Sequence, residues 1–234
     1  MDFFTSAQNL IHSGLDLLFP PACVHCKAPN VWLCQNCKSG IFFITSIVCP
    51  RCGTPASSPA CTQCSTNRLH YIDGIRSAAV FEDNPMRSAV HHLKYQGRKV
   101  LASSLAEMLA ETYQYYNLNA DVIIPVPLHR TRLKERGYNQ STLLAKKLGR
   151  LVGLPVDTTT LYRTRDTGQQ MALKAQQRRH NVAGAFACRG HLSGLKFLLV
   201  DDVCTTGSTL DACAMSLKMN GADAVWGLTL AKAT

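Results

Sequence analysis

The amino-acid sequence predicts an α/β protein in which a small cysteine-rich module precedes a doubly wound, mostly parallel sheet. Three observations lead to this prediction. Apolar runs with strand-like and helix-like periods alternate from residue 75 onward, one such run ends in two adjacent acids, and eight of the eleven cysteines fall between residues 23 and 64. We therefore expect the 234 residues to divide into a module at 1–70 and a larger domain at 71–234.

The module contains four C-x-x-C pairs, which are typical of zinc sites. Two thiolates at this spacing reach one ion from a tight turn, and two such turns complete a tetrahedral site of four cysteines. We expect about two structural zinc ions in a zinc-ribbon-like module, held by Cys23, Cys26, Cys34, Cys37, Cys49, Cys52, Cys61 and Cys64. Loop entropy mildly favours joining the first pair with the second and the third with the fourth, but crossed pairing stays open.

Disulfides are the alternative use of these cysteines, and they would indicate export. The N-terminal stretch MDFFTSAQNLIHSGLDLLFPP lacks the basic region and cleavage site of a signal peptide. Its apolar residues recur at helical spacing, so we expect an amphipathic helix docked on the rest of the chain, with an interfacial membrane helix as the alternative. No stretch is long and apolar enough to span a bilayer, and we expect a cytoplasmic protein.

The larger domain opens with a strand, IRSAAVFE, at residues 75–82. Helical patterns follow at 88–98 and 101–116. The apolar run 122–126 is the next buried strand, and two prolines end it because they lack amide donors.

The second half of the domain supplies the remaining expected elements: helices at 138–152 and 207–221, and strands at 155–163, 196–201 and 222–230. Residues 164–181 are polar, basic and weakly periodic. A segment like this is either a plain surface excursion or a mobile lid, whose cations would stabilise phosphates when it closes.

The segment LLVDDVCTTGSTL, residues 198–210, carries the clearest chemical signal. We expect a buried strand at 198–200 that stops at Asp201 and Asp202, after which small hydroxyl-bearing residues open a helix. A helix N-terminus offers amides to a phosphate, whereas adjacent acids suit sugar hydroxyls or a metal. The predicted ligand therefore carries a phosphate and vicinal hydroxyls, together with Mg²⁺. The alternative is a strand end with two solvated acids and an ordinary N-cap.

The formal net charge of +10 is concentrated in one part of the chain. Residues 125–190 contain thirteen Lys or Arg but three Asp or Glu, an excess that equals the charge of the whole chain. A basic segment beside a phosphate site indicates a polyanionic ligand, a nucleic acid or both, with a solvated basic face as the alternative. No G-x-x-x-x-G-K-[ST] loop of a nucleoside triphosphatase is present in the sequence.

Two further stretches carry a family resemblance. LLVDDVCTTGST resembles the phosphoribosyl pyrophosphate motif of type I phosphoribosyltransferases. PVPLHRTRLKERGYNQ, together with the C-x-x-C pairs, narrows the resemblance to the ComF family of competence-associated proteins, which includes GntX-like proteins. The resemblance spans nearly the whole chain and implies a type I phosphoribosyltransferase-like fold.

The resemblance implies roles for individual residues. Asp201 and Asp202 would be the catalytic acids that contact the ribose hydroxyls of phosphoribosyl pyrophosphate, which binds with Mg²⁺. The 5′-phosphate would be bound by Thr205, Thr206, Gly207, Ser208 and Thr209. The pyrophosphate loop would consist of Val126, Pro127, Leu128, His129 and Arg130. A flexible lid at 163–181 would carry Arg163, Arg165, Arg178 and Arg179.

The resemblance also implies a role in natural transformation and DNA uptake, in which imported single-stranded DNA is handled in the cytosol. The expected DNA contacts are Arg130, Arg132, Lys134 and Arg136, and DNA-uptake or recombination proteins are candidate partners. The alternative is an active phosphoribosyltransferase with an unidentified small-molecule acceptor, and whether catalysis occurs stays open. A transcription regulator is less favoured because no helix-turn-helix module is evident.

Overall fold

The computed structural model of the chain describes residues 20–55, 61, 69–165 and 184–233. Three expectations from the sequence lie outside the described residues. They are the N-terminal helix, the eighth cysteine of the module and part of the lid, namely residues 1–19, Cys64, Arg178 and Arg179.

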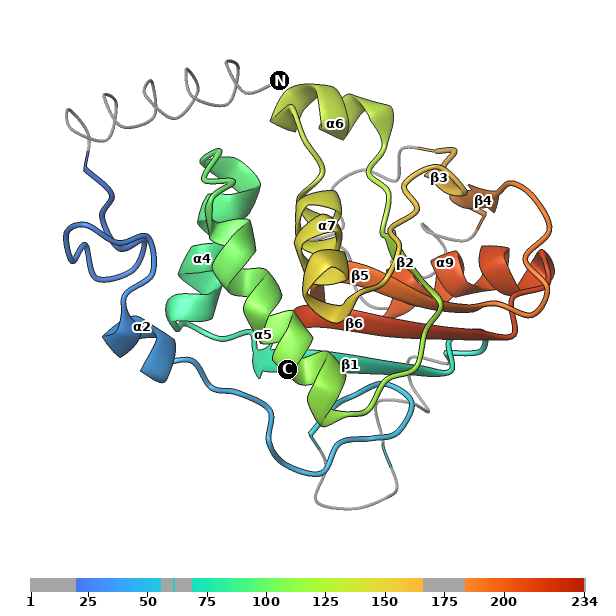
Figure 1. Cartoon of the computed structure of the whole chain (residues 1–234), viewed down its shortest axis with the longest axis horizontal. Coiled ribbons are helices and arrows are strands. Elements are labelled where there is room, and N and C mark those ends of the chain that lie inside the picture. The colour runs from blue at the N-terminus through green and yellow to red at the C-terminus, as the bar shows by residue number, and fades with distance from the viewer. Residues whose placement is uncertain (1–19, 56–60, 62–68, 166–183, 234) are drawn as a thin grey trace.

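A four-stranded parallel sheet forms the centre of the larger domain (Figure 1). Its strands lie in the order β1 (Gly74–Val80), β6 (Ala224–Lys232), β5 (Lys196–Cys204) and β2 (Val122–Pro125). Every neighbouring pair is parallel. All the carboxyl ends of the strands therefore lie along one edge, where α/β sheets bind ligands.

Helices cover both faces of this sheet, as a doubly wound domain requires. One face packs against α4 (Pro85–Tyr95), α5 (Leu101–Tyr115) and α7 (Gln140–Val152), and the other against α9 (Ser208–Met219). In β5, Leu198 and Val200 join the first core and Phe197 and Leu199 join the second. The strand is apolar on both faces because both faces are buried, so the predicted fold class is confirmed.

Asparagine side chains fix the starts of two helices. Asn84 accepts a hydrogen bond from the amide of Met86 at 2.9 Å, and Pro85 occupies the first helical position, where no amide donor is needed. Asn139 accepts from the amide of Ser141 at 2.9 Å and so starts α7. These caps place the C-terminal end of α4 and the N-terminal end of α7 beside the edge where β5 ends.

The strand expected at 155–163 is wrong in most of its length. Val156 makes one parallel bridge to Ile123, beside β2. Asp157 then accepts hydrogen bonds from the amides of Thr159 and Thr160 at 2.7 and 3.1 Å, and such an Asp-initiated turn ends the strand. The last three residues form β3 (Leu161–Arg163), which pairs antiparallel with β4 (Phe186–Cys188) in a separate two-stranded sheet.

Two other elements differ from the sequence-based expectation. Strand β5 does not stop at its acids, because Asp201, Val203 and Cys204 pair with the long strand β6. In addition, the segment after β2 forms a helix, α6 (Arg130–Arg136), where no helix was predicted. The side chain of His129 caps its start, and Gly137, at a φ of 75°, ends it.

The cysteine-rich module covers the outer edge of β1. The amide of Ile44 donates to the carbonyl of Ala78 at 2.9 Å, and the amide of Ile75 donates to the carbonyl of Arg51 at 2.8 Å. Gly53 has a φ of 67°, and a Cβ atom there would lie 2.3 Å from the Ile75 carbonyl oxygen. The module thus satisfies hydrogen-bonding groups that an edge strand would otherwise expose.

Candidate functional site

The cysteines of the module form two clusters. The sulfur atoms of Cys23, Cys26, Cys34 and Cys37 all lie within 4.8 Å of one another, and so do those of Cys49, Cys52 and Cys61. All the cysteines in the described part of the chain are free of disulfides. The first two C-x-x-C pairs therefore come together, and the third meets the described cysteine of the fourth, which is the order that loop entropy favours.

Backbone amides prepare the first cluster for a metal ion. The amide of Cys34 donates to the sulfur of Cys23 at 3.5 Å, and the amide of Cys37 donates to the sulfur of Cys34 at the same distance. Burial acts to raise the pKa of Cys23, but amides of Cys34, Cys26 and His25 outweigh it and lower that pKa to about 6. Because the thiolate is the form that binds metal, this arrangement supports zinc binding.

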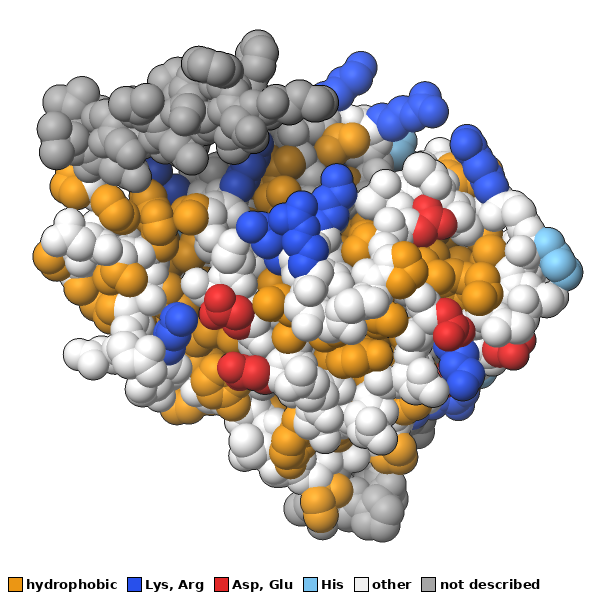
Figure 2. All heavy atoms as spheres, viewed as in Figure 1, with side chains coloured by type: hydrophobic (Ala, Val, Ile, Leu, Met, Phe, Trp, Pro, Cys, Tyr) orange, Lys and Arg blue, Asp and Glu red, His pale blue; other side chains and the backbone are white. Residues whose placement is uncertain are grey.

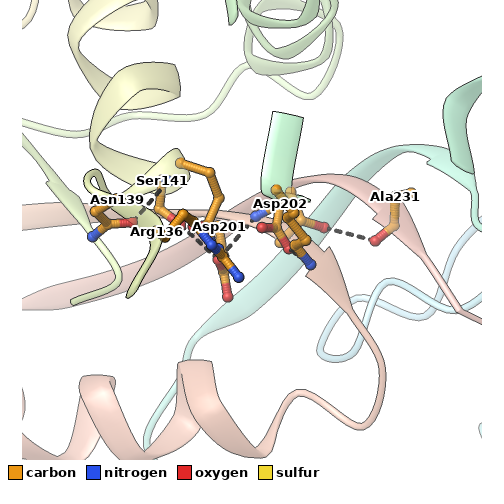
Figure 3. A network of polar contacts seen from close by, with 9 residues as sticks. Arg136, Asn139, Ser141, Asp201, Asp202 and Ala231 are labelled. Atoms are coloured by element: carbon orange, nitrogen blue, oxygen red, sulfur yellow. Dashed lines mark hydrogen bonds and ion pairs between the residues drawn. The ribbon is translucent and has the colours of Figure 1, made fainter. Parts of the chain in front are cut away.

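The two acids of the LLVDDVCTTGSTL segment lie at the carboxyl end of β5 (Figure 3). Asp201 accepts hydrogen bonds on Oδ1 from the Ser141 hydroxyl at 2.8 Å and from the Asp202 amide at 2.9 Å. Asp202 is buried and forms an ion pair, with 2.6 Å between its Oδ1 and the Nζ of Lys94. Its other oxygen, Oδ2, is buried and has no hydrogen-bond partner among the described residues. The acid pair therefore contains one buried acceptor whose hydrogen-bonding capacity is not used by the described residues.

Burial and mutual repulsion shape the charges of this acid pair. Burial, together with the charge of Asp202, raises the pKa of Asp201 to about 7, although Lys94 and the Ser141 hydroxyl act in the opposite direction. Burial also disfavours the charged form of Lys94, but Asp202 and Asp201 outweigh it and raise the pKa of Lys94. At neutral pH the site therefore holds one firm ion pair and one carboxyl group that is partly protonated.

The segment Thr205–Thr209, the expected phosphate loop, runs from the end of β5 into the first turn of α9. Gly207, at a φ of 83°, is the N-cap of α9 and provides no side chain to satisfy the first amides of the helix. A Cβ atom at this position would lie 2.9 Å from Cδ1 of Ile75. The Thr206 and Ser208 hydroxyls lie 2.8 Å apart. The loop thus brings amides, hydroxyls and the positive end of a helix dipole to one place.

A lysine that the sequence analysis missed lies beneath this loop. Lys232, near the end of β6, is fully buried, and its Nζ donates to the Thr205 carbonyl at 2.7 Å. It also lies 3.6 Å from the sulfur of Cys204. This contact fixes one peptide of the loop and places a positive charge under the expected phosphate site.

The expected pyrophosphate loop, residues 126–130, follows β2, which is the neighbour of β5. The amide of Val126 donates to the carbonyl of Val200 at 2.9 Å, and the Asn139 side chain donates to the Val126 carbonyl at 2.9 Å. Loop 126–130 therefore lies beside the acid pair. Because β2 and β5 are parallel neighbours, the turns that follow them lie at one edge of the sheet.

The described part of the expected lid is anchored on α9. Arg163 ends β3, where its guanidinium group lies 5.4 Å from the ring centre of Phe186 and its Nε donates to the Arg165 carbonyl at 3.3 Å. The carbonyl of Phe186 accepts from the hydroxyl of Ser216 on α9 at 2.9 Å. Strand β4 is thus bonded to α9, and β3 is held through its pairing with β4.

Three cation–aromatic pairs cross the surface next to the acid pair. The cation lies 5.3 Å from the ring centre for Arg136 over Tyr95, 4.8 Å for Lys99 over Tyr138, and 4.7 Å for Arg98 over Trp32. We call these six residues the cation–aromatic strip. It connects α6, the turn after α4 and the cysteine module. Figure 2 shows Lys and Arg side chains gathered on the upper part of this face, where Figure 1 places α6 and α7.

Several residues that sequence reasoning missed lie on or next to elements that it had predicted. Lys94, Tyr95, Arg98 and Lys99 lie in or next to the helix predicted at 88–98, and Lys232 lies just after the strand predicted at 222–230, as the last residue of β6. A signal existed for Lys94. Met86 and Val90 are buried four residues apart, so Lys94 takes the next position of the same apolar stripe. A lysine in such a position needs an acidic partner across the core.

Comparison with known proteins identifies both parts of the chain. The pattern of the double zinc ribbon domain matches residues 14–70, and that of the phosphoribosyl transferase domain matches residues 94–231. The DNA utilization protein YhgH of Salmonella typhimurium is 34% identical over 221 residues, which cover 89% of this chain and 96% of that protein. Competence protein ComFC of Bacillus subtilis is 28% identical, over 82% of this chain and 80% of that protein.

Among solved structures, a glutamine phosphoribosylpyrophosphate amidotransferase from B. subtilis matches with 21% identity and a TM-score of 0.41, covering 59% of this chain and 30% of that one. Within the described residues, no helix has both the length and the apolar character needed to cross a membrane. The zinc ribbon, the phosphoribosyl transferase domain and the relatives that match most of its length together show that the chain belongs to the ComF family.

Proposed function

We propose that this protein binds phosphoribosyl pyrophosphate with Mg²⁺ at the carboxyl edge of the sheet and handles imported single-stranded DNA during DNA uptake. One observation carries the phosphoribosyl part. The acid pair, the phosphate loop Thr205–Thr209 and the loop 126–130 come from neighbouring strands and meet at one edge. The relatives' names, which speak of DNA utilization and competence, support the DNA part.

The donors and acceptors at this edge fit the parts of the proposed ligand. Asp202 Oδ2, buried and without a partner in the described structure, would accept a hydrogen bond from a ribose hydroxyl. The amides and hydroxyls of the phosphate loop would bind the 5′-phosphate, with the charge of Lys232 behind them. Amides of the 126–130 loop would bind the pyrophosphate, and Mg²⁺ would neutralise part of its charge.

The cation–aromatic strip supports the choice of single-stranded DNA as the second ligand. Proteins that bind single strands combine cations that contact phosphates with aromatic rings on which bases stack. Tyr95 and the cations Arg98 and Lys99 are exposed, and Arg130 and Lys134 are exposed on α6 nearby. The strip borders the acid pair through Lys94 and Tyr95, so a strand lying along it would pass the phosphoribosyl site.

The acid pair also favours a second candidate function, a phosphoribosyltransferase acting on a small acceptor. When pyrophosphate leaves, positive charge develops on the ribose ring, and a buried site with an excess of negative charge stabilises that transition state. Asp202 pairs with the one ammonium group of Lys94, and Asp201 places a second carboxyl group beside this ion pair. The two candidates share the binding site and differ in whether turnover follows.

Isothermal titration calorimetry tests the proposal directly. The full chain is titrated with phosphoribosyl pyrophosphate and Mg²⁺, alone and with single-stranded DNA present. We expect 1:1 binding that is lost in the Asp201→Asn/Asp202→Asn double variant, since charged hydrogen bonds contribute roughly 1.5 to 3 kcal/mol each. The matched control is Asp83→Asn, which alters an exposed acid before α4.

Equal affinity in the double variant and the wild type would refute the proposed site. Single-strand binding that is sensitive to salt, without pyrophosphate release, supports the binding role. Pyrophosphate release that depends on a small acceptor and on Mg²⁺ supports the transferase instead.

A further inference from the structure

Lys94 reaches the acid pair from a helix that otherwise contributes apolar side chains. It follows Met86 and Val90 on the buried stripe of α4, and its side chain is 21% exposed. Its Nζ lies 2.6 Å from Oδ1 of Asp202. The position is also favourable for a cation because it lies in the last turn of α4, next to the negative end of the helix dipole.

The polar contacts around this ion pair are incomplete. Oδ1 of Asp201 accepts hydrogen bonds from two neutral donors, the Ser141 hydroxyl and the Asp202 amide. Asp202 uses one oxygen for Lys94, while its buried Oδ2 has no partner among the described residues. A buried ion pair with a purely structural role satisfies both carboxylate oxygens, since an unpaired buried acceptor destabilises the fold. The second oxygen is therefore held in place for a donor that comes with the ligand.

The charge at this point matters as much as the hydrogen bonds. Adjacent carboxylates are the usual ligands of Mg²⁺ in a phosphosugar site, and a divalent ion would balance them. Here an ammonium group already forms an ion pair with one oxygen of Asp202, whose side chain is buried. The partial protonation of Asp201 lowers the remaining charge further.

We propose that Lys94 is the resident cation of the phosphosugar site. It holds Asp202 in the orientation in which Oδ2 accepts a hydrogen bond from a sugar hydroxyl. It also takes the place that a divalent ion would otherwise occupy on the acid pair. This inference rests on the proposed phosphoribosyl function. It assigns Mg²⁺ to the pyrophosphate side of the ligand, because the acid pair has its cation already. Lys94 is a positioning residue, since it acts on the ligand through Asp202.

The test measures divalent-ion binding and ligand binding separately, on the full chain with its zinc bound. Mn²⁺ serves as the probe, and its binding to the protein without ligand is followed by electron paramagnetic resonance. The variant Lys94→Met keeps the length of the side chain and removes its charge. Lys94→Arg keeps the charge, and Lys147→Met removes a charge from the exposed face of α7 as the control.

We expect the wild type, Lys94→Arg and Lys147→Met to bind no Mn²⁺ at the acid pair. Lys94→Met should gain one Mn²⁺ site, at least about tenfold tighter than any residual binding of Mn²⁺ by the wild type, because the removed ammonium no longer repels the ion. The double variant Lys94→Met/Asp202→Asn should lose this ion again. Calorimetry should show weaker binding of phosphoribosyl pyrophosphate to Lys94→Met, and rescue in Lys94→Arg.

Two results would overturn the inference. One is a folded Lys94→Met protein that binds Mn²⁺ no better than the wild type. The other is a wild-type protein that binds one Mn²⁺ which Asp202→Asn removes, and this result decides the question even if the Lys94 variants do not fold. A wild type that fails to bind phosphoribosyl pyrophosphate would refute the proposed function, while the Mn²⁺ measurements would still test Lys94.

Discussion

The cysteine module and the carboxyl edge of the sheet both bring reactive side chains together. They differ in how many of those side chains have an interaction partner within the protein. The four sulfur atoms of the first cluster are identical ligands around one point, and backbone amides already stabilise the thiolate of Cys23. At the sheet edge, one of the two acids, Asp202, pairs with Lys94 through Oδ1, and its Oδ2 has no partner in the described structure. A single zinc ion would complete the first set, whereas in the proposed function a ligand that leaves again would complete the second.

The largest effect on stability is expected when the first cysteine cluster loses one of its four ligands. Cys23→Ser should remove about one of about two zinc ions per chain and unfold the module, because structural zinc contributes roughly 10 to 16 kcal/mol in small zinc peptides. Elemental analysis and thermal unfolding measure both effects. Cys188→Ser, outside both clusters, is the control. A wild-type protein with no zinc and intact disulfides would contradict the expectation.

The next effect concerns the conformation of the phosphate loop. Gly207→Ala combines a left-handed φ with a Cβ atom 2.9 Å from Ile75, so we expect a loss of stability of roughly 1 to 3 kcal/mol together with weaker phosphoribosyl pyrophosphate binding. Gly137→Ala is a matched control, since its φ of 75° is similar but a Cβ atom there meets nothing within 4 Å. Equal stability losses and unchanged binding in both variants would show that the contact is unimportant. Urea unfolding and calorimetry give the comparison.

A smaller effect follows from the raised pKa of Asp201, to about 7 in the folded protein. The unfolded carboxyl has a pKa of about 3.9, so between these values the folded state binds more protons than the unfolded state. Stability from this group is therefore full below about pH 4 and is lost as the pH rises through 7. Urea unfolding at pH 5 and pH 8 should show a steeper decline for the wild type than for Asp201→Asn. Parallel declines would mean that Asp201 is not the titrating group.

The smallest effect per substituted residue is expected on the basic surface, where the measured quantity is the affinity for single-stranded DNA. Arg132→Glu with Arg136→Glu should weaken single-strand binding and lower the slope of log affinity against log salt by about 0.7 for each lost phosphate contact. Arg98→Glu with Lys99→Glu should do the same if the cation–aromatic strip continues that surface. Lys27→Glu, on the exposed surface of the module, should matter less. DNA binding that survives both pairs of changes but disappears with residues 1–70 would assign the DNA surface to the module.

Local pattern predicted most of the fold and the positions of the two turns that meet at the sheet edge. The apolar runs at β1, β2, β5 and β6 and the C-x-x-C pairs carry their information in consecutive residues. The end of β5 was misjudged because the pairing of Asp201 and Cys204 depends on β6, a strand later in the chain. The strand at 155–163 was misjudged because one side chain, Asp157, favours a turn over pairing.

Sequence pattern predicted that the acids and residues Thr205–Thr209 would lie between a buried strand and a helix, but it did not predict the two lysines that contact them. Lys94 and Lys232 meet their partners across long stretches of sequence, and neither belongs to a recognisable motif. Their contacts follow from the strand order β1-β6-β5-β2 and from the packing of α4 beside β5. Predicting the contacts of these two lysines would have required the order and packing of elements that are far apart in the sequence, in addition to the chemistry of the residues.

The hydrogen bonds between the module and β1 bear on how the chain is made. During synthesis β1 emerges soon after the segment that bonds to its outer edge, from Phe42 to Arg51. Its partner on the inner edge, β6, appears last, since Ser77 and Thr229 are separated by 152 residues. A module that has already bound zinc at the ribosome would cover one edge of β1 during the time between the synthesis of β1 and that of β6. The supply of zinc during translation would then set how many nascent chains associate with one another before β6 arrives.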